Sequence, residues 1–501
     1  MMSSLSSSSE VIVAHGTMQK HEFRSDWDIV IVGAGLAGIN MAYRVQNQLP
    51  HCRYVVIESK SIVGGTWDTF RYPGLRADSD IYTYSYSWFP WNQKTKHPDR
   101  ESISRYLAAA ASSFRLGNKI LFNHKLHSAH WSSSLRQWEL VCHHHKAPPS
   151  AVVLRARFVI FCTGIFDHDE AREAEIAGLN SFSGPVVHPQ FWPDDLDYSD
   201  KHILLIGSGA TAMTLLPELA QTAASVTLVQ RSPGYLLTLP ERRHRKNGSW
   251  HWVHHLKWLL WMIVLKQFFQ VCHWFPGLIK QLCVFWARWQ LPAHVPVDPH
   301  FIPAYNPWEQ RPNVCFGWDM FRALKGGRAV IETGHIANVD RHGLKFQSGK
   351  FLPGDIIVTA TGLKLQFAGG VKVLVDGTEI DLGGRLAWNG AMIQDIPNLG
   401  FVTGYAHTSW TLGVDVRAQL ICRVIREMEK SGAPAMVPRF KGNVQAIAQR
   451  PVFLKSSYIL SQEHCLPRMG RDGPWKARNT YLTDYLFARY SRRVLEGLDC
   501  I

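Results

Sequence analysis

The sequence has few cysteines and lacks the cysteine pairs that mark several large protein classes. Nine cysteines are spread over 501 residues, and no two of them form a C-x-x-C pair. This absence argues against a zinc site and against the dithiol of a disulfide reductase. An odd number of scattered cysteines in a long chain is typical of reduced thiols inside a cell. We therefore expect a cytoplasmic protein without a bound metal.

Long apolar runs are also missing. The run at residues 258–265 ends after eight residues at Lys266, whereas a helix that crosses a bilayer needs about 20 residues. Residues 1–24 are rich in serine, and no cationic segment leads into an apolar core as it does in a secretion signal. The sequence thus predicts no membrane span, and we interpret residues 1–24 as a flexible extension.

The composition is that of a globular protein. Charged residues make up only 19% of the chain and hydrophobic residues 46%, and the length suffices for two or three domains. The net charge of +14 fits nucleic acid, a membrane surface or phosphorylated cofactors as partners. Because no nucleic-acid-binding module is recognisable, we expect no nucleic-acid partner.

A glycine-rich motif near the N-terminus has the context of a dinucleotide site. The apolar run 28–32 predicts a buried strand, the motif G-x-G-x-x-G follows at residues 33–38, and residues 39–48 have helical spacing. In this motif the first glycine permits the tight turn, the second admits the pyrophosphate and the third lets helix and strand pack closely. The predicted contacts are Gly33, Gly35, Ala37 and Gly38.

The acid that follows this motif indicates which nucleotide binds there. The next apolar run, 54–57, ends in Glu58, twenty residues after Gly38. A carboxylate at this position accepts hydrogen bonds from a ribose 2′-OH and repels a 2′-phosphate. The first site therefore suits FAD or NAD.

A second motif of the same kind differs at the equivalent position. The apolar run 203–206 leads into G-x-G-x-x-A at residues 207–212, and the next run, 226–230, ends in Arg231 and not in an acid. A guanidinium there can hold a 2′-phosphate with two hydrogen bonds, which indicates NADPH. The predicted contacts are Gly207, Ser208, Gly209, Ala210, Thr211, Arg231 and Ser232.

The segment between the two motifs resembles a known family. It reads F-x-G-x-x-x-H-x-x-x-W-P, with Phe182, Gly184, His188, Trp192 and Pro193, and is similar to the fingerprint of the Baeyer–Villiger monooxygenases. The runs G-G-T-W at 64–67 and R-Y-P-G-x-x-x-D at 71–78 resemble flavin-contacting segments of class B flavoprotein monooxygenases. The likeness spans about residues 26–480 and is strongest to the ethionamide-activating branch, which also shares the segment 305–311.

This resemblance implies an α/β fold with two Rossmann-like domains. It implies an FAD-binding domain at 25–165 and 363–501, an NADP-binding domain at 166–240 and 306–362, and a helical insertion at 241–305. By the same likeness Thr66, Trp67, Asp68 and Asp78 contact FAD, Leu126 lies against its adenine, and Arg76 and Asp78 lie where nicotinamide and flavin meet. Residues 401–405 would close the flavin site, and His188 would link the domains without transferring a proton.

The resemblance also implies the chemistry. Arg311 matches the family's essential arginine, and Asp78 would orient it. NADPH would reduce FAD, and a C4a-peroxyflavin formed with O2 would attack a ketone to give an ester or lactone. The aromatic residues favour a bulky apolar ketone, as in secondary metabolism. Two alternatives stay open: oxidation of sulfur or nitrogen by the same cofactors, and an inactive membrane-surface binding protein.

The tryptophan-rich stretch 241–305 also has two interpretations. Four basic residues at 242–246 precede a series of tryptophans and leucines. The stretch can be a helical lobe that walls a substrate tunnel, or an interfacial helix with tryptophans in the lipid boundary, giving peripheral membrane contact through 250–290. The oligomeric state is not indicated.

Overall fold

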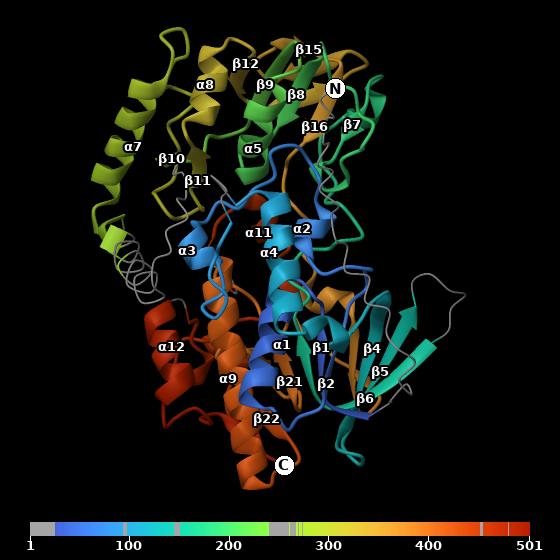
Figure 1. The fold of residues 1–501 in the computed structure, drawn as a ribbon. Helices are drawn as coiled ribbons and strands as arrows, with labels where there is room; N and C mark the ends of the chain where they lie inside the picture. The colour runs from blue at the N-terminus through green and yellow to red at the C-terminus, as the bar shows by residue number, and fades with distance from the viewer. Residues whose placement is uncertain are drawn as a thin grey trace, which may run out of the picture.

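The structure is a computed structural model, and it describes residues 26–93, 98–144, 151–239, 260, 267–268, 270–272, 274–450, 454–478 and 480–501. Two sheets lie one above the other in Figure 1, each with helices packed on it. The lower sheet combines segments from both ends of the chain, and the upper sheet is built from the middle. The predicted α/β fold with two Rossmann-like units is confirmed.

The lower sheet has a parallel half that carries the first glycine motif. Alternate residues of its central strand enter different cores, Ile29 and Ile31 on one face and Val30 and Val32 on the other. Burial on both faces explains the continuous apolar run in the sequence. The strands of this half, in spatial order, are β3 (Ile120–Leu121), β2 (Tyr54–Ile57), β1 (Asp26–Val32), β6 (Ala151–Phe161) and β21 (Leu399–Phe401).

An antiparallel extension completes this sheet. β6 is long enough to pair with β1 through its second half and with β5 through its first half. The further strands are β4 (His124–Ser132), β5 (Gln137–His144), β17 (Lys372–Val375), β18 (Thr378–Glu379), β19 (Ala387–Trp388) and β20 (Met392–Ile393). The sheet therefore brings residues near 130 beside residues near 373, far apart in sequence.

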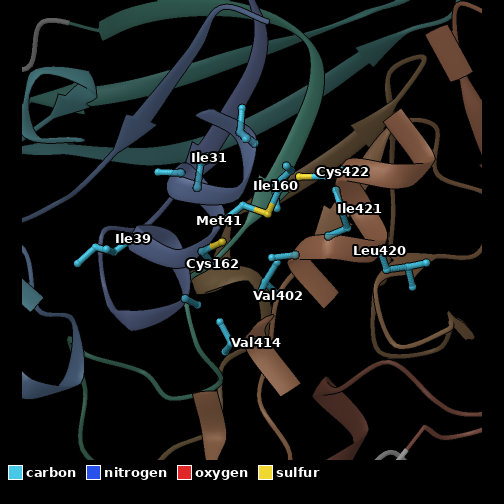
Figure 2. Close-up of a cluster of buried hydrophobic side chains, with 14 of the residues drawn as sticks. Ile31, Ile39, Met41, Ile160, Cys162, Val402, Val414, Leu420, Ile421 and Cys422 are labelled. Atoms are coloured by element: carbon cyan, nitrogen blue, oxygen red, sulfur yellow. The ribbon is translucent and has the colours of Figure 1, made fainter. Parts of the chain in front are cut away.

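Helices α1 (Leu36–Gln48), α4 (Arg100–Ser113) and α9 (Trp410–Ser431) contribute to the core on one face of the lower sheet. Figure 2 shows this core between α1, β6 and α9, with Met41, Ile160 and Ile421 among its side chains. α12 (Tyr481–Tyr490) packs on α9. The short helices are α2 (Thr66–Thr69), α3 (Ile81–Tyr84), α10 (Val444–Ile447) and α11 (Ser457–Leu460).

The upper sheet is parallel throughout and carries the second glycine motif. Its strands, in spatial order, are β12 (Ala329–Thr333), β9 (Ser225–Gln230), β8 (His202–Ile206), β16 (Ile356–Thr359) and β7 (Val186–Val187). Helices α5 (Ala210–Leu219) and α8 (Asp319–Lys325) share its main core. Smaller pairings are β10 (Leu236–Leu239) with β11 (Asn313–Phe316), and β13 (Ile336–Val339), β14 (Gly343–Phe346) and β15 (Phe351–Pro353) with one another.

The predicted helical insertion is seen only in part. Its described portion contains α7 (Pro276–Gln290), at the left edge of Figure 1, and much of residues 241–275 lies outside the described residues, as does the extension 1–24. Within the described ranges no helix joins the length and the apolar character required to cross a bilayer. The C-terminal region contains the strand pair β22 (Met436–Pro438) and β23 (Leu498–Cys500), which ties the chain end to the segment after α9.

Candidate functional site

A cavity of about 1250 Å³ lies between the two sheets, where parallel strands of both end. Ligands bind at this edge of open α/β sheets because loops and helix N-termini gather there. Seventeen predicted residues line the cavity: Gly33, Gly35, Ala37, Glu58, Thr66, Trp67, Arg76, Asp78, Leu126, Gly207, Ser208, Gly209, Ala210, Thr211, Arg231, Ser232 and Arg311. Gly38 and Asp68 lie outside its lining.

The first loop requires glycine at two positions for steric reasons. Gly33 has a φ of +101°, and a Cβ on it would lie 2.8 Å from the Cys162 carbonyl oxygen. A Cβ on Gly38 would lie 1.7 Å from the Gly33 carbonyl oxygen. Gly38 therefore acts by letting α1 pack against the loop, which explains why it does not face the cavity. Ile39 donates its backbone N–H to the Gly35 carbonyl. The backbone N–H groups of the residues before Ile39 stand at the start of α1, where they are oriented to bind an anion.

Glu58 stabilises this loop directly. Its side chain is nearly buried, at 6% exposure. One carboxylate oxygen accepts the Ala34 N–H at 2.6 Å, and the other accepts the Lys60 N–H at 2.9 Å. The carboxylate thus fixes the loop and still lines the cavity, where its remaining lone pairs can accept hydrogen bonds from a ribose.

The G-G-T-W segment lies against the first loop. Gly64 donates its N–H to the Ala34 carbonyl at 3.2 Å, and a Cβ on Gly65 would lie 3.0 Å from the Gly35 Cα. α2 begins at Thr66 directly after this contact. Asp68 lies outside the cavity lining and forms an ion pair at 3.3 Å with Lys60, which lines the cavity. Asp68 therefore holds the segment in place, and its contact with FAD stays a prediction.

Arg311 and Asp78 meet at the cavity wall. The Arg311 guanidinium donates to the Asp78 carboxylate at 2.8 Å and to the Ala406 carbonyl at 3.4 Å. Both side chains are about one third exposed, at 31% and 30%. These two acceptors, which lie far apart in the sequence, hold the guanidinium at a fixed place, while part of it remains open to a ligand.

Arg76 has a different partner from the one its position suggests. Its guanidinium pairs with Asp319, at the start of α8, at 2.5 Å and lies over the Phe316 ring at 5.4 Å. The pair is almost buried, with the side chains 10% and 13% exposed. Arg76 therefore connects the segment 71–78 to the upper unit while it lines the cavity.

The second loop repeats the geometry of the first. Gly207 has a φ of +141°, and a Cβ on it would lie 2.3 Å from the Ala360 carbonyl oxygen. At Gly209 a Cβ would meet nothing within 4 Å, so the loop backbone is open on that side. α5 starts at Ala210, and Arg231 lies exposed at the end of β9. Both lie on the cavity wall, so this loop offers N–H groups and a guanidinium to one ligand.

The fingerprint residues lie outside the cavity lining and contact the chain crossing between the units. The backbone N–H of Gln190 donates to Nδ1 of His188 at 3.2 Å, so Nε2 carries the proton and donates to the Gly362 carbonyl at 3.3 Å. Burial lowers the pKa of His188, which keeps the imidazole neutral. A Cβ on Gly184 would lie 2.2 Å from the Asp355 carbonyl oxygen. Phe182 and Trp192 pack in or against the cores of the upper unit.

Several residues of the site were missed by sequence reasoning. Tyr72 is buried and hydrogen-bonds the side chains of Thr211 and Thr214, and burial raises its pKa so that the phenol stays protonated. Asn313 holds the second loop through its amide, which donates to the Ser208 carbonyl at 2.9 Å. Tyr458, on α11, lines the cavity close enough to Arg311 for that charge to lower its pKa against the larger effect of burial. A tyrosine can take part in catalysis or binding, but nothing in the sequence connects Tyr458 with a motif.

One expectation is wrong. Residues 401–405 do not line the cavity; Phe401 instead extends the lower sheet beside Phe161. The wall is formed by a later residue, Trp410, at the start of α9. β21 takes the apolar side chains of this segment into the core. The chain reaches the cavity only after the Ala406 carbonyl.

The geometry of the cavity lining fits two dinucleotides. Each loop begins with a glycine on which a Cβ would clash with a backbone carbonyl, and each precedes a helix N-terminus. The hydroxyl of Thr361 lines the cavity and is buried without a hydrogen-bond partner among the described residues. Such an orphaned group is explained by a ligand that supplies the partner.

Known proteins match this chain over most of its length. The family model "Flavin-binding monooxygenase-like" matches residues 28–260. The FAD-containing monooxygenase EthA of Mycobacterium tuberculosis is 36% identical over 94% of this chain and 97% of its own. The probable FAD-binding monooxygenase AlmA of Acinetobacter baylyi is 35% identical over 93% of both chains.

Solved structures agree in fold. Steroid monooxygenase, solved in its oxidised form bound to NADP, has a TM-score of 0.74 at 19% identity, covering 95% of this chain and 99% of its own. OTEMO in complex with FAD and NADP has a TM-score of 0.68 at 21% identity, covering 82% and 86%. The chain thus contains both glycine loops, with Glu58 after the first and Arg231 after the second. Its relatives match it over nearly its full length. The chain belongs to the family of FAD-containing, flavin-binding monooxygenases.

Proposed function

We propose that this FAD- and NADPH-dependent monooxygenase inserts one atom of O2 beside a ketone carbonyl, the Baeyer–Villiger reaction. The balance is ketone, O2, NADPH and a proton going to ester or lactone, water and NADP+. The observation that carries the proposal is the Arg311 guanidinium, held by Asp78 on the wall of a cavity that both glycine loops line. We assign a bulky apolar ketone of secondary metabolism as substrate and the cytoplasm as location.

The two loops divide the cofactors between them. We assign FAD to the loop with Glu58, in residues 25–165 and 363–501, and NADPH to the loop with Arg231, in residues 166–240 and 306–362. A buried carboxylate that already accepts two N–H groups suits a ribose hydroxyl, and an exposed guanidinium suits a 2′-phosphate. FAD, once reduced, supplies the redox chemistry that activates O2.

Arg311 supplies fixed positive charge where negative charge develops on the substrate's carbonyl oxygen. A charge that is already in place costs little reorganisation in the transition state, and a lost donor of this kind typically lowers kcat by about 100- to 1000-fold. Asp78 limits the freedom of the guanidinium through the 2.8 Å contact. The neutral His188 holds the crossing at Gly362 and stays outside proton transfer.

The test compares a ketone with the thioether of the same shape. The purified, FAD-loaded chain is given NADPH and ¹⁸O2, and products are identified by mass. We expect ketone-dependent NADPH oxidation and an ester that carries one labelled oxygen. Turnover of the thioether alone, to a sulfoxide, would overturn the Baeyer–Villiger assignment in favour of heteroatom oxidation.

Two variants separate the role of Arg311 from general damage. Arg311→Ala should still reduce its flavin with NADPH but should form ester at least about 100-fold more slowly. Arg385→Ala is the matched control, because Arg385 forms an ion pair with Asp395 at similar exposure, 29% and 31%, and does not line the cavity. Full ester formation by Arg311→Ala would refute the assignment.

A further inference from the structure

We propose that the exposed apolar face of α7 is a docking surface for a bilayer that contains anionic lipid. The proposal does not depend on which substrate is oxidised, because it rests on a helix outside the cavity lining.

One face of α7 is anchored to the protein. Ile279, Ala287 and Gln290 are buried. The Gln290 side chain accepts a hydrogen bond from the Thr238 hydroxyl at 3.0 Å, and its amide donates to the Trp286 carbonyl at 2.9 Å. The helix therefore has a defined orientation, and so has the face that adjoins these buried residues.

This adjoining face is apolar and exposed. Its side chains are Leu278 at 54% exposure, Leu282 at 45%, Phe285 at 63%, Trp286 at 54% and Trp289 at 69%. At about 100° per residue these five lie within an arc of about 100°. Trp274 and Phe275, at 63% and 56%, extend the stripe beyond the helix start. A soluble surface seldom exposes so many large apolar groups together, and such patches mark interaction sites.

The charge of this region selects the partner. Residues 242–297 contain no Asp or Glu and eight cations: Arg242, Arg243, Arg245, Lys246, Lys257, Lys266, Lys280 and Arg288. Their net charge is 8 − 0 = +8, more than half of the +14 of the whole chain. Arg288 is exposed and adjoins the apolar stripe on the helix surface. Tryptophan and leucine on one face of α7, with Arg288 beside them in a basic stretch of sequence, is the composition of an interfacial helix.

Other occupants fit less well. A second copy of the chain would bring two regions of charge +8 together, which Coulomb repulsion opposes. A nucleic acid would satisfy the charge but leave the apolar stripe in water. A bilayer with anionic headgroups satisfies both, because the headgroups attract a stretch of this charge while the stripe enters the acyl boundary.

Two further observations agree with this orientation. α12 exposes Leu482, Leu486 and Tyr490 at helical spacing, at 47%, 48% and 63%, and lies on the same edge of the molecule as α7 in Figure 1. Trp308, three residues before Arg311, packs edge-to-face on Phe268, which precedes α7, with ring centroids 6.3 Å apart. A residue that precedes the docking helix in sequence thus contacts the segment that carries Arg311, which suits an apolar substrate drawn from lipid.

The test is flotation of the FAD-loaded full chain with vesicles. The vesicles are phosphatidylcholine alone, or phosphatidylcholine with phosphatidylglycerol, at about 0.1 M and about 1 M salt. We expect the chain to float with the anionic vesicles at low salt and Trp286→Gln/Trp289→Gln to bind them at least about tenfold more weakly. Leu135→Gln is the matched control, because Leu135 is 67% exposed in the turn between β4 and β5, away from α7.

Each other result overturns the proposal. The chain can fail to float, or Leu135→Gln can lose as much binding as the double variant, which would show a non-specific effect. Binding that the double variant retains in full would show that charge alone acts. A dimer in sedimentation that the double variant separates, without flotation of either, would assign the face to a second copy. NADPH oxidation in solution, unchanged in both variants, confirms that they are folded.

Discussion

Arg231→Ala should convert this enzyme from one that prefers NADPH to one that treats NADPH and NADH alike. Arg231 is the residue that distinguishes the two otherwise similar loops, since the first loop carries Glu58 at the corresponding place. Only the 2′-phosphate differs between the two coenzymes, so a residue that holds this phosphate affects one coenzyme and leaves the other unchanged.

The size of the effect follows from the exposure of Arg231. A hydrogen bond to a charged group contributes about 1.5–3 kcal/mol when it is shielded from water, but exposed ion pairs contribute only about 0.2–1 kcal/mol. Arg231 is exposed at the end of β9, yet it lies on a cavity wall that a bound coenzyme would cover. We therefore expect about 2 kcal/mol, which is about a 30-fold rise in the dissociation constant for NADPH.

The assay is flavin reduction by stopped flow over a range of NADPH and NADH concentrations. It measures coenzyme affinity before any oxygen chemistry and needs no known substrate. Arg328→Ala is the control, because Arg328 is an exposed arginine of the same unit that donates to the Gln221 carbonyl at 2.9 Å and lies outside the cavity lining. An equal weakening for both coenzymes, or none for NADPH, would refute the assignment of the second loop.

Three further predictions concern the loops and the crossing. Gly38→Ala places a Cβ 1.7 Å from the Gly33 carbonyl oxygen, so we expect loss of bound FAD by absorbance and a lower Tm, while Gly117→Ala, whose Cβ meets nothing within 4 Å, should keep both. Glu58→Ala leaves the N–H groups of Ala34 and Lys60 without their acceptor, at about 1–3 kcal/mol each; urea unfolding should show this loss, and Glu58→Gln, which keeps one acceptor oxygen, should recover part of it. Burial lowers the pKa of His188 from its ordinary 6.5, so the unfolded chain binds a proton that the folded chain does not, and stability should fall as pH drops below about 6.5, by at most about 1.4 kcal/mol per unit for this group. His188→Gln should make the fall in the urea midpoint shallower, and an unchanged pH dependence would contradict the buried neutral imidazole.

The parts of the site that sequence reasoning located are those in which one short segment determines its own geometry. A strand, a glycine turn and a helix start follow one another without interruption at residues 28–48, and sterics at Gly33 and Gly38 then leave one arrangement. The acid and the arginine that sort the coenzymes lie at the ends of the next strands. Local spacing is enough for such features because parallel strands end at a common edge.

The parts that were missed depend on which distant segments meet. Asp68 belongs to a correctly located segment, but it reaches the cavity wall only through its ion pair with Lys60. Residues 401–405 were expected at the flavin because they follow the crossing in sequence, whereas the strand pairing of Phe401 with Phe161 takes them into the core. Tyr458 and Trp410 line the cavity from the C-terminal third of the chain, where no motif pointed to them.

The segment 70–78 shows why such contacts matter for function. Phe70, Tyr72 and Leu75 belong by sequence to the first unit but pack in the core of the second. Gly74 approaches α5 so closely that a Cβ would lie 2.6 Å from the Thr214 carbonyl oxygen. Four residues after Gly74, Asp78 holds Arg311. The same stretch therefore fixes the distance between the two loops and the position of the guanidinium, so a shift of the upper unit against the lower one would move Arg311 with it. The sequence R-Y-P-G identifies the segment, but the φ of +75° at Gly74 and its packing on α5 explain why it contains a glycine there.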